Sequence, residues 1–191
     1  SLLVASLDTI AWLFNIRGND VKCNPVAVCF AYVSRKETVL FINPKKLTKE
    51  MSAYLQQEGI ILAEYDKIFD YVSAIPAHTA ICLQGSKVSF TLYNKISKDC
   101  RVIDIPSPAD LMKSRKNETE IQGIRNAMER DGVALVKFQM WLEKAVPEGG
   151  VEESTIVDKL VEYRSQQDFY VGESFDTIDG YVPNGALVHY L

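Results

Sequence analysis

The order of apolar segments in the first part of the chain limits its possible folds more than any other property. A short helical segment, Asp8–Phe14, is followed by two strand-like runs, Val26–Val33 and Thr38–Ile42, with a polar turn between them. Three units then follow, each a helical segment and a strand-like one: Leu47–Glu58 with Ile60–Glu64, Asp66–Ala74 with Thr79–Gln84, and Ser89–Ile96 with Arg101–Ile105. Adjacent strands followed by helix-then-strand units predict an α/β fold with a mixed sheet.

This pattern stops at Pro106–Ala109, and a basic segment, Leu111–Lys116, comes next. Proline-rich interruptions of this kind are typical of domain boundaries. The sequence therefore predicts two domains, residues 1–110 and residues 111–191.

The second domain begins with helical periodicity. A long helix is predicted from Glu118 to about Ala145, capped by Asn117, and a second helix from about Glu152 to Gln167. Two β-prone runs, Ser174–Ile178 and Ala186–Tyr190, then flank a turn-rich centre. Because that centre contains Asn-Gly, a strong signal for a tight turn, these runs predict a β-hairpin.

Composition excludes several classes of protein. Apolar residues make up 47% of the chain and the formal net charge is −4, so a core is expected but no basic surface for nucleic acid. Apolar runs are shorter than the roughly 20 residues of a membrane span, and Ser1–Ile10 lacks the basic start of a signal peptide. The four cysteines are irregularly spaced, which favours reduced thiols over a zinc site. A soluble chain is expected.

Pattern alone leaves the function open. His189 ends the last strand-like run, where histidine is usually structural but can also act in proton transfer, and His78 lies in a predicted surface loop. Asp176 and Asp179 alternate with apolar residues and form either a solvated strand face or a carboxylate pair for metal or proton chemistry. The loop 15–21 contains Arg, Gly and Asp, which fits an interdomain turn with a local salt bridge or a substrate contact.

Several sequence blocks resemble the Xaa-Pro aminopeptidases of the creatinase, or pita-bread, metallopeptidase family. Leu7–Val21 with the following Asn-Pro-Val is similar to the middle domain of the three-domain members. Lys116–Glu120 and Val146–Gly150 are similar to the start of their catalytic domain, and the two runs of the predicted hairpin to the hairpin that precedes the metal ligands. The resemblance implies a creatinase N-terminal-like (ribonuclease H-like) domain over residues 1–110. It also implies the truncated N-terminal portion of a pita-bread α+β domain over residues 111–191.

The resemblance also implies an activity. The Xaa-Pro aminopeptidases of that family are manganese-dependent exopeptidases that release the first residue of peptides with proline in second position. They use two metal ions that share a water or hydroxide. Their metal ligands lie downstream of this chain, so no catalytic or metal-binding residue is expected in it. What carries over is substrate binding: His189 matches a histidine that hydrogen-bonds the substrate, and Phe175 matches an aromatic residue of the pocket. Tyr181–Pro183 departs from the smaller turn common in the family.

On this resemblance the chain is a central slice of a cytoplasmic, homodimeric enzyme that acts on peptides, not on nucleic acids or membranes, and the slice itself is expected to be inactive. A second hypothesis stays open. Some pita-bread relatives are pseudo-peptidases that keep the fold to bind peptides or proteins without catalysis. Acidic and imidazole metal ligands in the sequence after Leu191 would distinguish the enzyme from the binding module.

Overall fold

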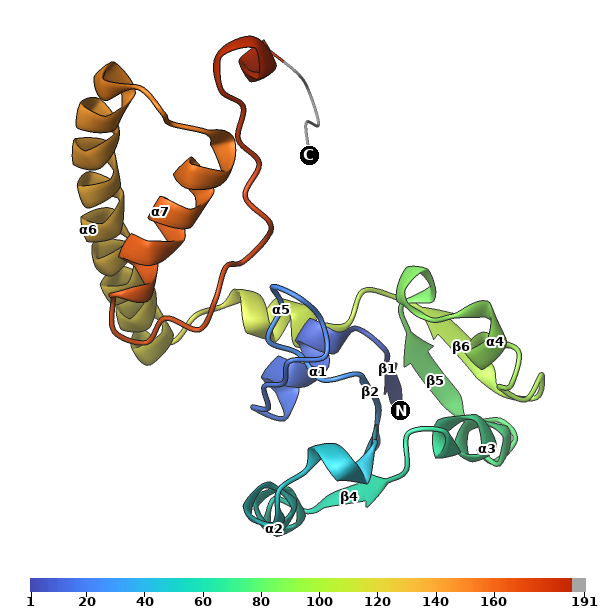
Figure 1. Ribbon diagram of the computed structural model, residues 1–191. Helices are drawn as coiled ribbons and strands as arrows, with labels where there is room; N and C mark the ends of the chain where they lie inside the picture. The colour runs from blue at the N-terminus through green and yellow to red at the C-terminus, as the bar shows by residue number, and fades with distance from the viewer. Residues whose placement is uncertain (187–191) are drawn as a thin grey trace. The chain divides into compact units, whose positions relative to one another are not determined.

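The computed structural model describes residues 1–186, and its chain divides into two compact units, Ser1–Arg115 and Lys116–Leu191 (Figure 1). The first unit contains a six-stranded sheet and the second a pair of long helices. The predicted assignment of residues 1–110 and 111–191 to two domains of the family stays a prediction. The units are described one at a time below.

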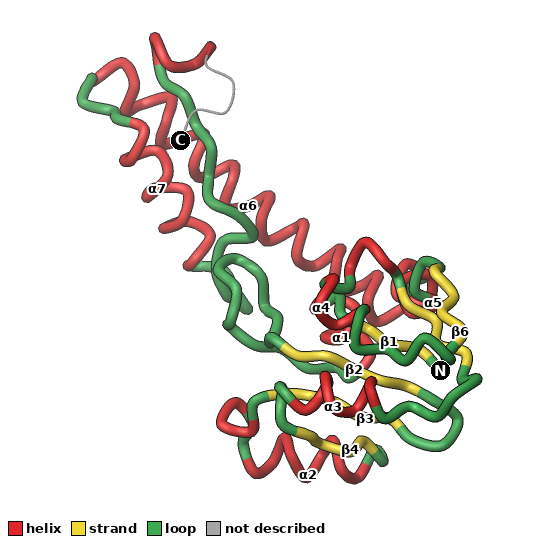
Figure 2. The backbone as a smooth tube through the Cα atoms, turned by 90° about the vertical axis from the view of Figure 1, so that its right-hand side faces the viewer, coloured by secondary structure: helices red, strands yellow, loops and turns green. Residues whose placement is uncertain are grey.

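The sheet of the first unit has the strand order β4-β3-β2-β1-β5-β6; Figure 1 labels β5, and Figure 2 labels the other strands. Its strands are β1 Leu2–Val4, β2 Cys29–Val33, β3 Thr38–Ile42, β4 Ile60–Ala63, β5 Ala80–Leu83 and β6 Arg101–Asp104. The pairs β1–β2 and β2–β3 are antiparallel, whereas β3–β4, β1–β5 and β5–β6 are parallel. The predicted mixed α/β sheet is thus confirmed.

The sequence did not predict β1, although this strand occupies the middle of the sheet. Leu3 lies opposite Tyr32 of β2, and Leu2 lies opposite Cys82 of β5. Three residues are too few to show a period-2 pattern, and helix α1 follows after only two more. The strand is recognisable only once the rest of the sheet is in place.

Helices connect the strands and cover the sheet. They are α1 Leu7–Leu13, α2 Lys49–Gln57, α3 Lys67–Ser73, α4 Phe90–Tyr93 and α5 Pro108–Ser114, with 3₁₀ turns η1 Pro44–Lys46 and η2 Gly85–Lys87. Hydroxyl caps start two of them, because the Thr48 side chain accepts a hydrogen bond from the Met51 amide and Ser89 from Leu92.

Apolar side chains form two clusters, one on each face of the sheet. Val39 and Phe41 of β3 belong to the cluster that contains Ile68 of α3 and Leu92 of α4. Alternate residues of the same strand, among them Leu40, belong to the cluster that contains residues of α1 and α2. Because successive side chains of a strand point to opposite faces, β3 supplies both layers of the core.

The segment predicted to be a basic connector, Leu111–Lys116, is instead largely helical. Helix α5 begins at Pro108 and packs on α1, where the Thr9 hydroxyl donates to an Asp110 carboxylate oxygen at 2.5 Å. Proline at the first helical position has no amide to leave unpaired and its φ already suits a helix. Pro108, which belongs to the predicted proline-rich interruption, is therefore the start of a helix.

The second unit is built on α6 Glu118–Glu148 and α7 Glu153–Ser165, which pack on each other. Both predicted helices are confirmed. A capping box starts α6: the Asn117 side chain accepts from the Glu120 amide, and the Glu120 carboxylate accepts from the Asn117 amide. Gly149, with φ of 79°, follows its last turn.

The predicted hairpin does not form in the part of the chain that the structure describes. Ser174–Ile178 has no strand, and the turn-rich centre is the 3₁₀ helix η3, Val182–Ala186. Most of the second predicted strand lies outside the described residues. An isolated two-stranded hairpin is marginally stable in water, and described residues 116–186 contain no further strand against which one could pack.

Candidate functional site

Of the two residues expected to contact substrate, the structure describes Phe175; His189 lies outside the described residues. Phe175 belongs to the segment 171–181, which has neither helix nor strand, and its side chain is 67% exposed. It lines a hollow of about 670 Å³ whose walls come from α6, α7 and the segment that follows α7. Met128, Leu160 and Ile178 give part of this wall an apolar character.

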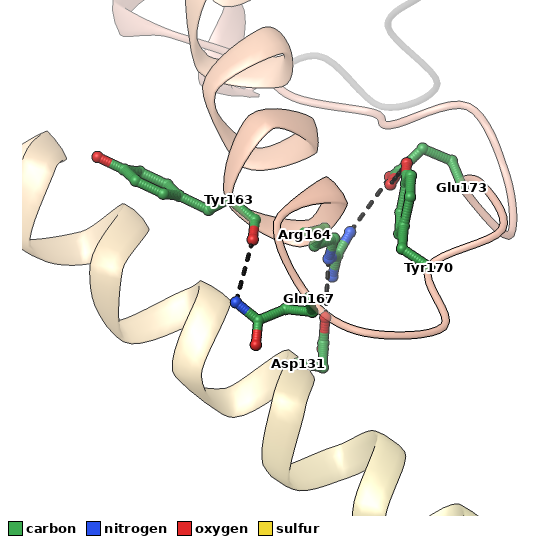
Figure 3. A network of polar contacts seen from close by, with 6 residues as sticks. All are labelled: Asp131, Tyr163, Arg164, Gln167, Tyr170 and Glu173. Atoms are coloured by element: carbon green, nitrogen blue, oxygen red, sulfur yellow. Dashed lines mark hydrogen bonds and ion pairs between the residues drawn. The ribbon is translucent and has the colours of Figure 1, made fainter.

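A network of charged groups forms part of the wall of this hollow and joins the two helices to the loop that carries Phe175 (Figure 3). Arg164 of α7 donates from Nε to Asp131 Oδ1 of α6 at 2.8 Å. The same guanidinium donates from Nη1 to Glu173 Oε2 at 3.2 Å. One planar side chain thus connects two carboxylates that are far apart in sequence.

The second oxygen of Glu173 is also used. Tyr170 donates its hydroxyl to Glu173 Oε1 at 3.0 Å, so both oxygens of this carboxylate accept hydrogen bonds (Figure 3). Partial burial disfavours the charge of Arg164, but hydrogen bonding and attraction to Asp131 and then Glu173 outweigh it and raise the pKa of Arg164. The guanidinium is therefore a permanent cation at this position.

The loop also contacts α6 through an aromatic ring. Phe169 has φ of 64°, a left-handed conformation that is unusual for a bulky residue. The guanidinium of Arg130 lies 5.3 Å from the centroid of its ring, within range of a cation–π interaction. Arg130 thus contacts the chain directly at Phe169, whereas the next residue of α6, Asp131, is linked to it only through Arg164 and Glu173.

The loop 15–21 has a structural role within the first unit. Arg17 donates to the carbonyls of Ala11 and Ile16 at the end of α1, at 3.0 and 2.9 Å. Asp20 accepts from Lys46 Nζ and from the Val28 amide, each at 2.6 Å, and these bonds lower its pKa. The segment is a turn, but the predicted local salt bridge is wrong: Asp20 pairs with Lys46 of η1, 26 residues away in the same unit, and not with Arg17.

Asp176 and Asp179 differ in their surroundings. Asp176 is exposed, whereas Asp179 is partly buried and has an Oδ2 atom that is shielded from solvent and has no hydrogen-bond partner. Desolvation and then the nearby charge of Glu153 raise the pKa of Asp179. Across residues 1–186, no three His, Cys, Asp or Glu side chains are grouped so that they could hold a metal ion.

The remaining candidates have structural explanations. His78 is exposed in a loop, as predicted, and its amide donates to the Asp99 carbonyl. All four cysteines are free thiols, and burial raises the pKa of Cys29 to about 12, so that it stays protonated. None of the helices described is long and apolar enough to cross a bilayer.

Comparison with known proteins defines the class. The sequence model of one protein family, the creatinase/prolidase N-terminal domain, matches residues 1–120, so the chain belongs to this family. The sheet and the helices that cover it are the part of the molecule that this match spans.

Within the family, the chain is similar to Xaa-Pro aminopeptidases. It is 38% identical to a probable Xaa-Pro aminopeptidase P of Botryotinia fuckeliana over 99% of its own length and 30% of that protein. A second such protein, from Sclerotinia sclerotiorum, is also 38% identical, over 98% of the chain and 33% of that protein. The chain thus spans about a third of the length of these curated relatives.

A solved structure gives the same result. The X-prolyl aminopeptidase of Caenorhabditis elegans, described as a cytosolic enzyme with a di-nuclear active site, superposes with a TM-score of 0.84 at 32% identity. The superposition covers 93% of this chain and 30% of that one. The X-Pro aminopeptidase of Thermotoga maritima shares the fold, with a TM-score of 0.55 at 19% identity over 86% of this chain and 46% of the other.

Proposed function

We propose that this chain is part of a metal-dependent Xaa-Pro aminopeptidase that releases the first residue of peptides with proline in second position. The observation that carries the proposal is similarity along nearly the whole chain: 38% identity over 99% of its length to a probable Xaa-Pro aminopeptidase P. Similarity confined to residues 1–120 would support the family alone, because that region is the N-terminal domain shared with prolidases.

Two residues are proposed to contact the peptide. Phe175 is suited to an apolar contact, because its ring is largely exposed and lines a hollow whose wall is apolar in part. His189 is proposed to hydrogen-bond the substrate near the scissile bond, since imidazole offers both a donor and an acceptor. Residues 111–191 are proposed to be the N-terminal portion of the catalytic domain, following the creatinase N-terminal-like domain of residues 1–110.

The proposed metal is manganese, as a pair of ions that supply an activated water for attack on the peptide carbonyl. The described residues do not fit such a site, because no three potential ligands are grouped among residues 1–186. Their proposed role is therefore to bind and orient the peptide. This chain is proposed to be inactive by itself, and the whole enzyme to be a cytoplasmic homodimer.

The test compares two polypeptides: this chain of 191 residues and the complete product of the open reading frame that contains it. Each is incubated with Arg-Pro-Pro and manganese chloride, and free arginine is measured by mass spectrometry. The complete product is expected to release arginine from Arg-Pro-Pro, to stop when EDTA is added, and to leave the control peptide Arg-Ala-Pro intact. The 191-residue chain is expected to match a no-protein control.

Either of two results would overturn part of this proposal. Turnover by the 191-residue chain would show that the metal site does not lie outside it. No turnover by the metal-loaded complete product, combined with measurable binding of the peptide, would instead establish a pseudo-peptidase that binds peptides without cleaving them.

A further inference from the structure

The loop that carries Phe175 depends on side chains for its position. From Val171 to Tyr181 the described backbone has neither helix nor strand, and Phe169, Val171 and Phe175 are strongly exposed. Segments with few buried contacts and no ladder of backbone hydrogen bonds open at low free-energy cost. A substrate contact placed on such a segment needs other groups to hold it in a productive position.

Arg164 provides the connection between this loop and the helices. Its Nε–Asp131 bond of 2.8 Å joins α7 to α6, and its Nη1–Glu173 bond of 3.2 Å joins both helices to the loop. Arg164 and Glu173 are only 28% and 19% exposed, so solvent screens their interaction less than that of a surface pair. The guanidinium fork also fixes the direction of each bond, which a flexible ammonium would not.

Glu173 transmits this constraint to Phe175. Because one carboxylate oxygen accepts from Arg164 and the other from Tyr170, the side chain is held at both of its oxygens. Phe175 follows only two residues later, a distance of at most about 7 Å along an extended chain. A displacement of Glu173 would therefore move the Phe175 ring relative to the wall of the hollow.

We infer that Arg164 is a positioning residue for substrate binding: through Glu173 it fixes the loop that presents Phe175 to the peptide. The inference rests on the proposed function, in which Phe175 contacts the peptide. Arg164 does not itself touch the substrate in this scheme. Its loss is expected to raise KM with little change in kcat, because an apolar contact of the pocket acts before and during the reaction alike.

A double-mutant cycle in the complete enzyme tests this inference. Arg164→Met is expected to lower kcat/KM for Arg-Pro-Pro about tenfold in the native background and less than about twofold in Phe175→Ala, because a positioning residue has no effect once its target is removed. The matched control is Lys159→Met, which removes another cation of α7, paired with Glu162 at 2.6 Å and not with the loop. It is expected to change kcat/KM less than about twofold in either background.

Equal losses from Arg164→Met in both backgrounds would refute the positioning role and indicate a general structural one. If Arg164→Met does not fold, as judged by circular dichroism, Glu173→Gln takes its place in the cycle. That variant weakens the contact to the loop and leaves the Arg164–Asp131 bond between the helices intact.

A second measurement does not depend on activity. Cleavage by chymotrypsin after Phe175, followed by mass spectrometry on the complete polypeptide, is expected to be at least about fivefold faster in Arg164→Met than in Lys159→Met, because a released loop more often adopts the extended shape that a protease binds. Equal cleavage rates in the two variants would overturn the inference even in an active enzyme. If the native polypeptide cleaves no Xaa-Pro peptide, the proposed function fails, while the chymotrypsin rates still decide whether Arg164 holds the loop.

Discussion

Replacing Leu40 by alanine is expected to cost the first unit about 3–4 kcal/mol of unfolding free energy. Leu40 is completely buried in β3, in the cluster on the α1 and α2 side of the sheet. The substitution removes about three methylene-sized groups at about 0.8 kcal/mol each, or roughly 2.5 kcal/mol of transfer free energy. Because β2 and β4 hydrogen-bond β3 on both sides, the backbone cannot collapse into the space, and a cavity cost adds to this value.

Urea unfolding followed by tryptophan fluorescence measures the loss. Trp12 lies on α1 in the first unit and Trp141 on α6 in the second, so a Trp141→Phe background leaves Trp12 as the reporter of the first unit. The matched control is Ile61→Ala on β4, where the native side chain is 48% exposed. A loss from Leu40→Ala below about 1.5 kcal/mol, or no larger than that of the control, would show that this cluster does not stabilise the sheet as argued.

Two further predictions concern a charge and a helix cap. The Lys46 and Val28 hydrogen bonds lower the pKa of Asp20 from 3.8, so their contribution to stability is present above that pH and is lost as the pH falls through the folded-state pKa. Asp20→Asn should therefore flatten the acid side of the stability profile measured through Trp12; an unchanged slope would contradict this. Asn117→Ala should lower the stability of the second unit by about 1 kcal/mol in thermal unfolding monitored at Trp141. Asn117→Asp, which can still cap α6, should not; equal effects of the two variants would show that the capping box adds nothing.

Most of the fold could be predicted from the order of its segments, because its strands are short apolar runs, buried on both faces of the sheet in β3, and its helices have clear start and stop signals. Thr38–Ile42 was predicted with the bounds that the structure shows. Helix α6 runs three residues beyond the predicted Ala145, since Pro147 is accommodated in its last turn and Gly149 ends it. Strand β1 was missed because its partners come from β2 and β5, so its strand character depends on tertiary pairing.

The predicted hairpin shows the limit of local signals. Asn184-Gly185 favours a tight turn, but the choice between a hairpin turn and η3 depends on whether neighbouring strands pair. The Glu153 carboxylate accepts from the Tyr181 amide at 2.9 Å and from Asn184 Nδ2 at 3.1 Å, which holds this turn against the start of α7. Such contacts across 28 and 31 residues leave no periodic trace in the sequence.

The candidate site, like the fold, could be predicted only in part from the sequence. Phe175 was found by its resemblance to a family position, and the structure places it beside a hollow. The Asp131–Arg164–Glu173 network was not predicted, because its members are 33 and 9 residues apart and each is an ordinary charged residue of a helix or loop. Charges at such separations can be paired only when the packing of α6 against α7 is known.

Because β1 is short and central, the fold of the first unit is unusually sensitive to the insertion or deletion of residues next to this strand. β1 alone joins β4-β3-β2 on one side to β5-β6 on the other. Leu3 belongs to one apolar cluster and Val4 to the other, so removing or adding a single residue ahead of α1 would exchange the layers to which they contribute. Homologous sequences that vary freely in loop length should therefore keep the spacing between this strand and the first helix constant.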